Sequence, residues 1–317
     1  MTESRPDPCD LSVIMPAYQA ASTIRRALSS IAAQTLKPRE VIIVDDGSTD
    51  GTLDLARDFI PAMHEIPVKL HRQANLGPGA ARNKALLAAR GRFISFLDAD
   101  DEWLPTKLER SLAVLRRGGF RMVAHDILLV RNGHEIRVDC CRRWAEAPAT
   151  PFLTLYRRGY ISCSTVVAER ELLLAIGGFN STLRSGQDYD LWLAALAHID
   201  DRFTMFDEAL LRYFPVEGGI TSRTESRRHN DLITLRAHLS NLRRRTTAWI
   251  WPVLLRTFLV QVTAAREHFH RKRVSAAALC LGGVLPECFR SLRAASRNEV
   301  PRQNYLLDVP GEGAPPP

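Results

Sequence analysis

The chain has 317 residues, 45% of them hydrophobic and 25% charged, which excludes wholesale disorder and argues against a membrane channel. Six cysteines without a CxxC pair predict neither a zinc site nor a disulfide framework, and no signal peptide is evident, so we expect a cytoplasmic protein. The net charge of +8 is uneven, because residues 222–299 carry 15 Lys and Arg against 5 Asp and Glu.

The first hundred residues alternate short apolar runs with helical periodicity, a pattern typical of βαβ units and a parallel sheet. It predicts strands at 12–15, 41–44, 68–71 and 93–97, a helix capped by Ser22 and another helix at 80–89. The second and fourth strands run into acidic turns, 45–50 and 98–101. Open α/β sheets bind ligands at the carboxyl ends of parallel strands, which makes both turns candidates for a site.

The pattern becomes mixed after Asp101. It predicts a helix at 105–115, a hairpin of strands 121–130 and 134–138 around Asn132-Gly133, a strand at 161–168, helices at 169–176 and 188–197, and a last strand at 209–214. We place a domain boundary near Ser222. The expected organisation is a catalytic domain at 1–222, a basic helical region at 223–300 and a disordered Pro-rich tail at 301–317.

The helical region allows two interpretations. Residues 247–265 are largely apolar, but Pro252 and Arg256 interrupt them and the stretch is short for crossing a bilayer. Basic flanks at 243–245 and 271–273 fit an interfacial helix in peripheral contact with an anionic membrane, and a helical hairpin packed on the catalytic domain fits equally well. Nucleic acid ranks low as a partner because aromatic residues are sparse here.

Asp98, Ala99 and Asp100 form a DxD unit at a predicted strand end. Paired carboxylates suit Mg²⁺ or Mn²⁺, which prefer oxygen ligands and are commonly shared with substrate phosphates. A single DxD unit is weak evidence for a metal site, since acidic residues also gather in turns and helix caps. We expect the neighbouring Asp101 and Glu102 to cap the helix that follows.

Four segments in order make a stronger signal. They are 13–18 (VIMPAY), 44–50 (VDDGSTD), 79–83 (GAARN) and 97–101 (LDADD), with 177–179 (GGF) and 186–192 (GQDYDLW) further along. In these segments the sequence resembles the family 2 glycosyltransferases, an inverting family with the GT-A fold, over roughly residues 10–222. The resemblance implies an α/β catalytic domain with a mixed, mainly parallel central sheet, followed here by a C-terminal helical extension.

The resemblance places the donor nucleotide at the first two strand ends. It implies that Pro16, Ala17, Tyr18 and Asp46 line the base pocket. The Tyr18 ring could pack on the base, and Asp46 could accept a hydrogen bond from a base N–H. The plainer alternatives are a half-buried core aromatic for Tyr18 and a helix cap for Asp46.

The same resemblance assigns the diphosphate side of the donor. Arg82 would reach the ribose or diphosphate, although a surface salt bridge is a close alternative. Asp98 would contact the ribose side, and Asp100 would bind Mn²⁺ or Mg²⁺, which bridges the diphosphate and stabilises the leaving group.

Asp188 occupies the position of the family's catalytic base, which takes the proton of the acceptor hydroxyl. Gln187 stands where Glu is usual, and Trp192, one turn later, is expected in the core rather than against a sugar. Val216 stands where many members carry a His near the metal, so the metal lacks that ligand unless His229 supplies it.

The resulting expectation is transfer of a sugar from a nucleotide diphosphate donor, UDP by first guess, to a hydroxyl of a glycan or lipid-linked saccharide in cell-envelope or exopolysaccharide synthesis. A non-catalytic nucleotide-sugar or glycan-binding module of the same fold is one alternative. A sugar-phosphate nucleotidyltransferase is another, but residues 15–19 lack the Gly-rich loop that it would need.

Overall fold

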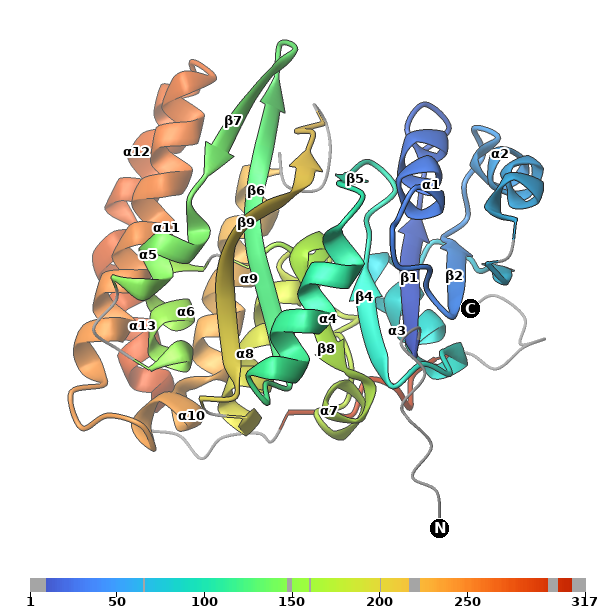
Figure 1. The fold of residues 1–317 in the computed structure, drawn as a ribbon. Coiled ribbons are helices and arrows are strands. Elements are labelled where there is room, and N and C mark those ends of the chain that lie inside the picture. The colour runs from blue at the N-terminus through green and yellow to red at the C-terminus, as the bar shows by residue number, and fades with distance from the viewer. Residues whose placement is uncertain are drawn as a thin grey trace.

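The computed structural model describes residues 10–64, 66–146, 150–159, 161–199, 201–216, 223–295 and 302–309. A mixed sheet lies between two layers of helices (Figure 1), in the strand order β3-β2-β1-β4-β8-β6-β9-β5, with β7 paired to β6. The strands are β1 Leu11–Ala17, β2 Glu40–Asp45, β3 Val68–Arg72, β4 Phe93–Phe96, β5 Glu102–Trp103, β6 Met122–Arg131, β7 His134–Val138, β8 Val167–Glu169 and β9 Phe203–Tyr213.

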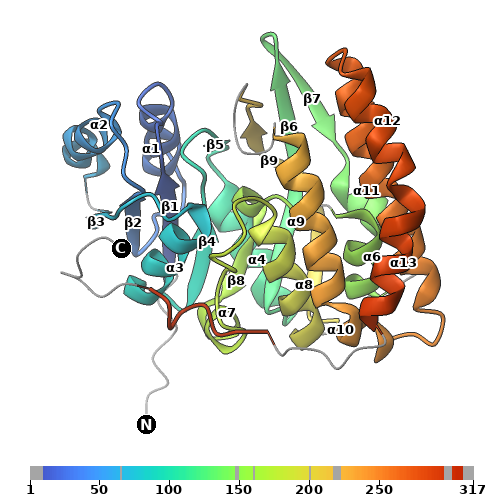
Figure 2. The same cartoon turned by 180° about the vertical axis from the view of Figure 1, so that it is seen from behind.

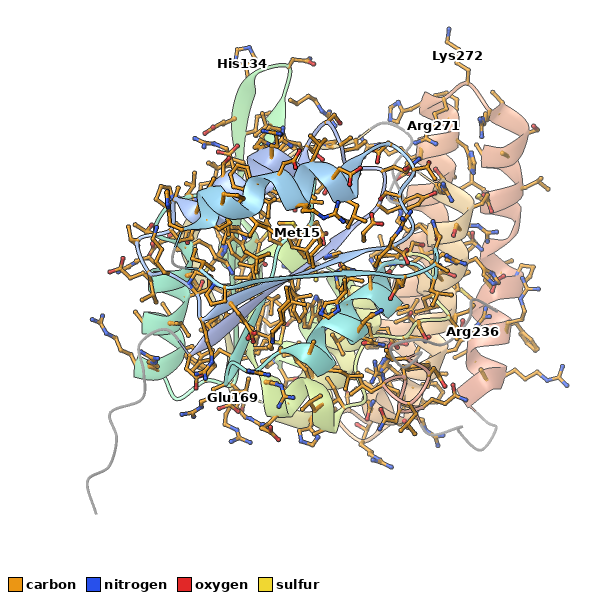
Figure 3. All side chains as sticks on the ribbon, turned by 90° about the vertical axis from the view of Figure 1, so that its right-hand side faces the viewer. Met15, His134, Glu169, Arg236, Arg271 and Lys272 are labelled. Carbon is orange, nitrogen blue, oxygen red and sulfur yellow. The ribbon has the colours of Figure 1, made fainter. Side chains whose placement is uncertain are left out.

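The half of the sheet formed by β3, β2, β1 and β4 is parallel, as the βαβ pattern predicts. β1, β2 and β4 are buried along their whole length because helices cover both faces, whereas the edge strand β3 is only partly buried. Val13 and Met15 pack towards one layer and Ile14 towards the other. Figure 3 shows Met15 deep inside these layers. One layer holds α1 Ile24–Ala32, α2 Thr52–Phe59 and α4 Lys107–Arg117; the other holds α3 Pro78–Ala88, α6 Pro151–Arg158, α7 Arg170–Ala175 and α8 Gln187–Ile199.

The other half of the sheet is mixed. β8 runs antiparallel to β4 and β6, and β9 runs parallel to β6 with register shifts near Asp126. The β6–β7 hairpin is confirmed, and Asn132 and Gly133 both take positive φ at its turn. The short helix α5, Cys140–Ala145, follows it.

Three local predictions need correction. The strand expected at 161–168 is confined to β8, because the 3-10 turn Cys163–Thr165 occupies its first half. The last strand, β9, already begins at Phe203 rather than at Ala209. Helix α1 begins one residue later than expected, so that Thr23 rather than Ser22 is its N-cap residue. The expected domain boundary near Ser222 lies outside the described residues.

The C-terminal helices pack on the α/β body at its edge opposite α2 (Figure 2). They are α9 Thr224–Ala237, α10 Leu239–Arg243, α11 Ile250–His270, α12 Val274–Gly282 and α13 Val284–Ala295. Leu235, Leu242 and Val253 join the same apolar cluster as α6 and α8, so the packed arrangement expected as one alternative is present. Across the described ranges, no helix combines the length and apolarity needed to span a bilayer.

The stretch 302–309 differs from the expected disordered tail. The Arg302 guanidinium donates to Asp190 in α8 and to the carbonyl oxygens of Ile176 and Gly178. Its neighbour Tyr305 donates its backbone N–H to the Gly177 carbonyl at 3.0 Å. Buried polar contacts therefore hold this part of the chain against the catalytic body. Residues 310–317 lie outside the described part.

Candidate functional site

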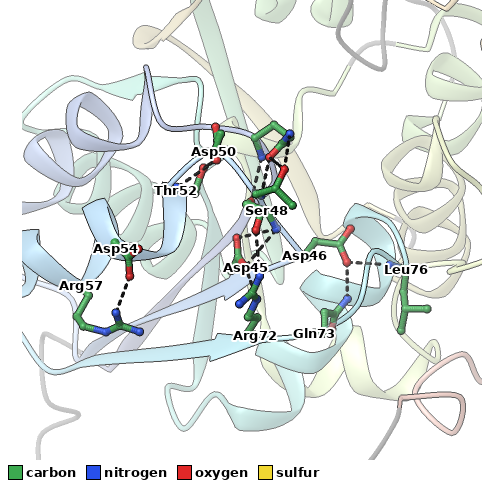
Figure 4. Close-up of polar contacts among 12 residues, drawn as sticks. Asp45, Asp46, Ser48, Asp50, Thr52, Asp54, Arg57, Arg72, Gln73 and Leu76 are labelled. Atoms are coloured by element: carbon green, nitrogen blue, oxygen red, sulfur yellow. Dashed lines mark hydrogen bonds and ion pairs between the residues drawn. The ribbon is translucent and has the colours of Figure 1, made fainter. Parts of the chain in front are cut away.

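The turn after β2 braces the loop after β1 through short polar side chains (Figure 4). The hydroxyl of Ser48 accepts the backbone N–H of Gln19, and that of Thr52 accepts the backbone N–H of Ala20. Gly47 takes φ +80°, and a Cβ there would meet the backbone nitrogen of Asn75 at 3.0 Å. The sequence of this turn therefore fixes the two strand ends against each other.

Asp46 lies at this junction, buried beneath the loop before α3. Its carboxylate accepts hydrogen bonds from the Gln73 side chain and from the backbone N–H groups of Leu76 and Gly77, at 2.8–2.9 Å (Figure 4). Burial is the largest influence and raises the pKa of this carboxyl, against these hydrogen bonds and the charge of Arg184. Asp46 thus shapes the loop before α3 rather than capping the helix that follows its own turn.

The three other residues assigned to the base pocket lie at the end of β1. Pro16 and Ala17 have buried side chains, and the Ala17 carbonyl accepts the backbone N–H of Asp46 at 2.8 Å. The Tyr18 ring is 51% exposed, so it is not the half-buried core aromatic of the plainer interpretation. An exposed ring beside Asp46 is free to pack against a planar ligand.

Arg82 and Asp98 form an ion pair between α3 and the end of β4, in which Arg82 is buried and Asp98 is partly exposed. The guanidinium nitrogen Nη2 lies 2.5 Å from Asp98 Oδ1, and the Arg82 side chain is 5% exposed. Its Nε and Nη1 are buried without a hydrogen-bond partner among the described residues. Unpaired buried donors are costly, which suits a site that an anion completes. The expected alternative, a surface salt bridge, is wrong.

The two acidic residues after Asp98 have different environments. Burial and the charge of Asp98 raise the pKa of Asp100 to about 6. Asp101 is fully buried and accepts a hydrogen bond from the Ser164 hydroxyl at 2.6 Å, while Glu102 pairs with Arg212 at 2.6 Å. Neither caps α4, so that expectation is wrong. Asp101 is held by the turn at 163–165, and Glu102 is held by Arg212 on β9.

The DxD carboxylates are suitable ligands for a divalent cation. The charge of Asp98 raises the pKa of Asp100, and the charges of Asp98 and Asp100 both raise the pKa of Asp101, so the three carboxylates lie close together. Only Asp98 among them has a side-chain ion pair within the described ranges. The surplus of negative charge on oxygen donors fits Mn²⁺ or Mg²⁺. Two other groups of potential ligands, Glu225/His268/Cys280 and Asp126/Asp139/Asp207, lie elsewhere, and arginines already pair with both.

Asp188 lies in the first turn of α8, facing the same cluster. Burial raises the pKa of its carboxyl, and the charges of Arg82 and Asp98 both act on it. Tyr189 donates its backbone N–H to Asp188 at 2.8 Å. The fold therefore gathers Arg82, Asp98, Asp100 and Asp188 from three separate segments into one electrostatic cluster.

Comparisons with known proteins identify the family. The model of the family described as "Glycosyl transferase family 2" matches residues 12–159. TuaG of Bacillus subtilis, named for teichuronic acid biosynthesis, is 33% identical over 215 residues, which cover 67% of this chain and 81% of that protein. The chain belongs to glycosyl transferase family 2. It is also 31% identical to the Escherichia coli glucosyltransferase WfgD, over 59% of this chain and 69% of WfgD.

Solved structures confirm the GT-A type of fold for this family 2 glycosyltransferase. A fragment of TarS from S. aureus in complex with UDP-GlcNAc has a TM-score of 0.66 at 22% identity, covering 90% of this chain and 82% of the fragment. The longer TarS chain is covered over half its length. The mannosyltransferase PcManGT of Pyrobaculum calidifontis, solved with GDP-Man and Mn²⁺, has a TM-score of 0.58 at 20% identity, covering 97% of this chain and 88% of PcManGT.

Two features of the transferase site escaped the sequence reasoning. The Arg26 guanidinium stacks 3.7 Å from the centroid of Phe214 and donates to the Asp100 carbonyl at 2.6 Å. Arg184 donates to Asn75 at 3.2 Å, beside the loop that Asp46 holds. No local pattern marks either arginine, because each contact joins segments that are distant in sequence.

The structure places the two residues that bear on the expected missing His. Val216 is 43% exposed and offers no ligand atom. Within the described ranges, His229, exposed on α9, forms no hydrogen bond or ion pair with Asp98 or Asp100. Trp192 is fully buried against Phe96, which confirms the core assignment.

Proposed function

We propose that this family 2 glycosyltransferase transfers a sugar from a nucleotide diphosphate donor with inversion, and that Asp188 is its base. The buried Arg82 with two unpaired donors, held between Asp98 and Asp188, carries the proposal. An anion is the natural partner of those donors, and the diphosphate of the donor has the right charge and geometry.

In the proposed step the acceptor hydroxyl oxygen attacks the anomeric carbon on the face opposite the diphosphate. A carbon–oxygen bond to the acceptor forms, the bond to the diphosphate oxygen breaks with its electron pair on the diphosphate, and the hydroxyl proton passes to Asp188. Arg82 holds the donor by its phosphate oxygens, while Tyr18 and Asp46 bind the base. Mn²⁺ or Mg²⁺ at Asp100 would neutralise charge on the leaving diphosphate.

The printed names of relatives support a substrate class. WfgD is named as a UDP-Glc-dependent glucosyltransferase acting on a GlcNAc-diphosphoundecaprenol, and ExoU of Rhizobium meliloti is named for succinoglycan biosynthesis. We infer a UDP-sugar donor and a glycan or lipid-linked saccharide acceptor for this chain, in cell-envelope or exopolysaccharide synthesis at the cytoplasmic face of the membrane.

Calorimetric titration of UDP, GDP and dTDP with Mn²⁺, Mg²⁺ or EDTA tests the donor site. We expect UDP to bind only with metal, and Asp100→Ala to abolish that binding. Asp54→Ala, which removes an exposed carboxylate of α2, is the matched control and should bind as the unaltered chain does. Absence of binding of every nucleotide with either metal would refute the proposal.

We also propose peripheral contact with an anionic membrane through α11, α12 and α13. Large apolar side chains stand exposed on all three helices: Trp251 is 74% exposed, Leu279 77%, Leu285 79% and Phe289 73%. Arg271 and Lys272 project at the α11–α12 turn, at the outer end of the helical region (Figure 3). A helical region that exposes both large apolar side chains and cations suits a surface of anionic lipid.

A further inference from the structure

A second concave site lies between α6, α9 and α11. This pocket of about 440 Å³ has a strongly basic lining. Its charged residues are Arg157, Arg158, Arg227, Arg228, Arg256 and Asp231. We call these residues the arginine pocket. Such a volume falls within the range of pockets that bind small ligands.

Not all of this positive charge is neutralised within the protein. Arg227 pairs with Glu267, and Arg228 with Glu225 at 2.7 Å. On α6, Arg157 makes no ion pair with any carboxylate of the described residues. The pocket therefore keeps a net positive charge after its internal ion pairs are formed.

Arg256 lies at the inner wall of the arginine pocket and is only partly satisfied. Its Nη2 forms an ion pair with Asp231 at 3.7 Å, which is too long for a hydrogen bond, and its Nη1 donates to the Arg158 carbonyl at 3.4 Å. Its Nε is buried without a partner among the described residues. A guanidinium in this state favours a ligand that brings acceptor oxygens.

The arginine pocket borders the catalytic cluster on the side of the base. Arg256 lies 5.4 Å from the centroid of the Tyr189 ring, and Tyr189 follows Asp188 directly. A Cβ at Gly186, two residues before Asp188, would lie 3.4 Å from Asp231. The charge of Asp188 also acts on the carboxyl of Asp231 in the pocket, so a ligand bound there would lie close to the proposed base.

We propose that the arginine pocket binds a phosphate or diphosphate group of the acceptor while a sugar hydroxyl of the same acceptor reaches Asp188. The inference rests on the proposed function, because it assigns the acceptor side of that site. The planar fork of Arg157 matches phosphate oxygens in pairs, and Arg158 and Arg256 add positive charge beside it. The negative charge of Asp231 would repel a bound phosphate, so replacing this residue with a neutral one should strengthen phosphate binding.

Titration of inorganic pyrophosphate in EDTA tests the pocket without the donor metal. We expect binding by the unaltered chain, at least about tenfold weaker binding by the double variant Arg157→Gln/Arg158→Gln, and tighter binding by Asp231→Asn. The matched control, Arg116→Gln/Arg117→Gln, removes the same charge from the exposed end of α4 and should change nothing.

The variants separate this inference from the donor site. Pyrophosphate binding that survives the Arg157/Arg158 double substitution but is lost in Arg82→Gln would place the anion in the donor site and overturn the inference. Unchanged binding in all variants would overturn it as well. Metal-dependent UDP binding, measured separately on the same proteins, reports on the proposed function alone.

A vesicle experiment distinguishes a lipid headgroup from a free phosphate. Flotation with phosphatidylcholine vesicles, with or without phosphatidylglycerol, is measured for the unaltered chain and the Arg157/Arg158 double variant. Retained flotation together with weakened pyrophosphate binding supports a pocket for the acceptor phosphate. Lost flotation with unchanged pyrophosphate binding would show that these arginines bind the bilayer surface, and would overturn the inference.

Discussion

At the scale of single residues, Arg82 connects Asp98, which we propose for the donor side of the site, with Asp188, the proposed base. It pairs with Asp98, and its charge also acts on Asp188. The Phe179 ring lies 5.4 Å from its guanidinium and confines it from another side. A cation held so firmly, with donors left over, is organised for its ligand before the ligand arrives.

Arg82→Lys tests whether the shape of this cation matters beyond its charge. Lysine keeps the charge but loses the planar fork, so we expect the donor KM to rise about tenfold or more while the fold is retained. Steady-state kinetics with the donor varied measure this, and Arg116→Lys on the surface of α4 serves as the control. A donor KM that stays the same in Arg82→Lys would contradict the role of the fork.

Asp188 gives the site a predictable pH dependence. Burial raises the pKa of its carboxyl, and only the ionised form can accept the hydroxyl proton. Activity should therefore rise with pH along an acidic limb whose midpoint lies above the usual carboxyl range near 4. The pH profile of kcat/KM measures this limb.

Asp188→Asn removes the proposed base without changing the shape of the site. We expect kcat to fall by about 10²–10⁴-fold and metal-dependent UDP binding to stay intact. The two measurements together distinguish loss of proton transfer from loss of the donor site. Full activity in this variant would reject Asp188 as the base.

At the scale of elements, Asp190 joins α8, the α9–α10 junction and the segment 302–309. Its carboxylate lies 3.0 Å from His238 Nε2 and 3.0 Å from Arg302 Nη2, and all three side chains are largely buried. Burial acts to raise the pKa of Asp190, but the hydrogen bond and charge of His238, with those of Arg302, outweigh it and lower the pKa.

Asp190→Asn should therefore destabilise the fold. Removing one partner of a buried charged cluster costs about 3 kcal/mol or more. Because the folded pKa is lowered, the stabilisation from Asp190 is fully present above its unfolded pKa and is lost as pH falls through the folded pKa. Thermal unfolding near neutral pH and again at acid pH should show a deficit that shrinks on acidification. A deficit independent of pH would contradict this.

Local patterns predicted the parallel half of the sheet well, because alternating strand and helix periods are written into neighbouring residues. The same holds for the hairpin at Asn132-Gly133. The prediction failed where distant segments decide the structure: Ser164 binds Asp101, and Arg302 binds Asp190. Motifs in the sequence suggested the proposed site residues, whereas Arg26 and the arginine pocket depend on packing between elements that no single segment encodes.

At the scale of the whole molecule, the excess positive charge and the exposed apolar side chains both lie in the C-terminal helical region. Residues 222–299 have a net charge of +10, and the exposed apolar side chains of α11, α12 and α13 lie within that range. The arginine pocket opens beside α11, so a membrane held against these helices would lie near the acceptor side of Asp188. This arrangement fits an acceptor anchored in lipid.

The triple variant Leu279→Gln/Leu285→Gln/Phe289→Gln tests this arrangement. Burial of each such side chain contributes about 1.5–3 kcal/mol, so we expect binding to phosphatidylglycerol vesicles to weaken about 100-fold or more. Leu87→Gln/Ile136→Gln removes exposed apolar side chains outside these helices, on α3 and β7, and should float like the unaltered chain. Flotation measures both, with sizing of the lipid-free protein alongside. If the triple variant still floats, these side chains do not mediate membrane binding. If the unaltered chain forms dimers that the triple variant does not, they cover another copy of the chain rather than a membrane.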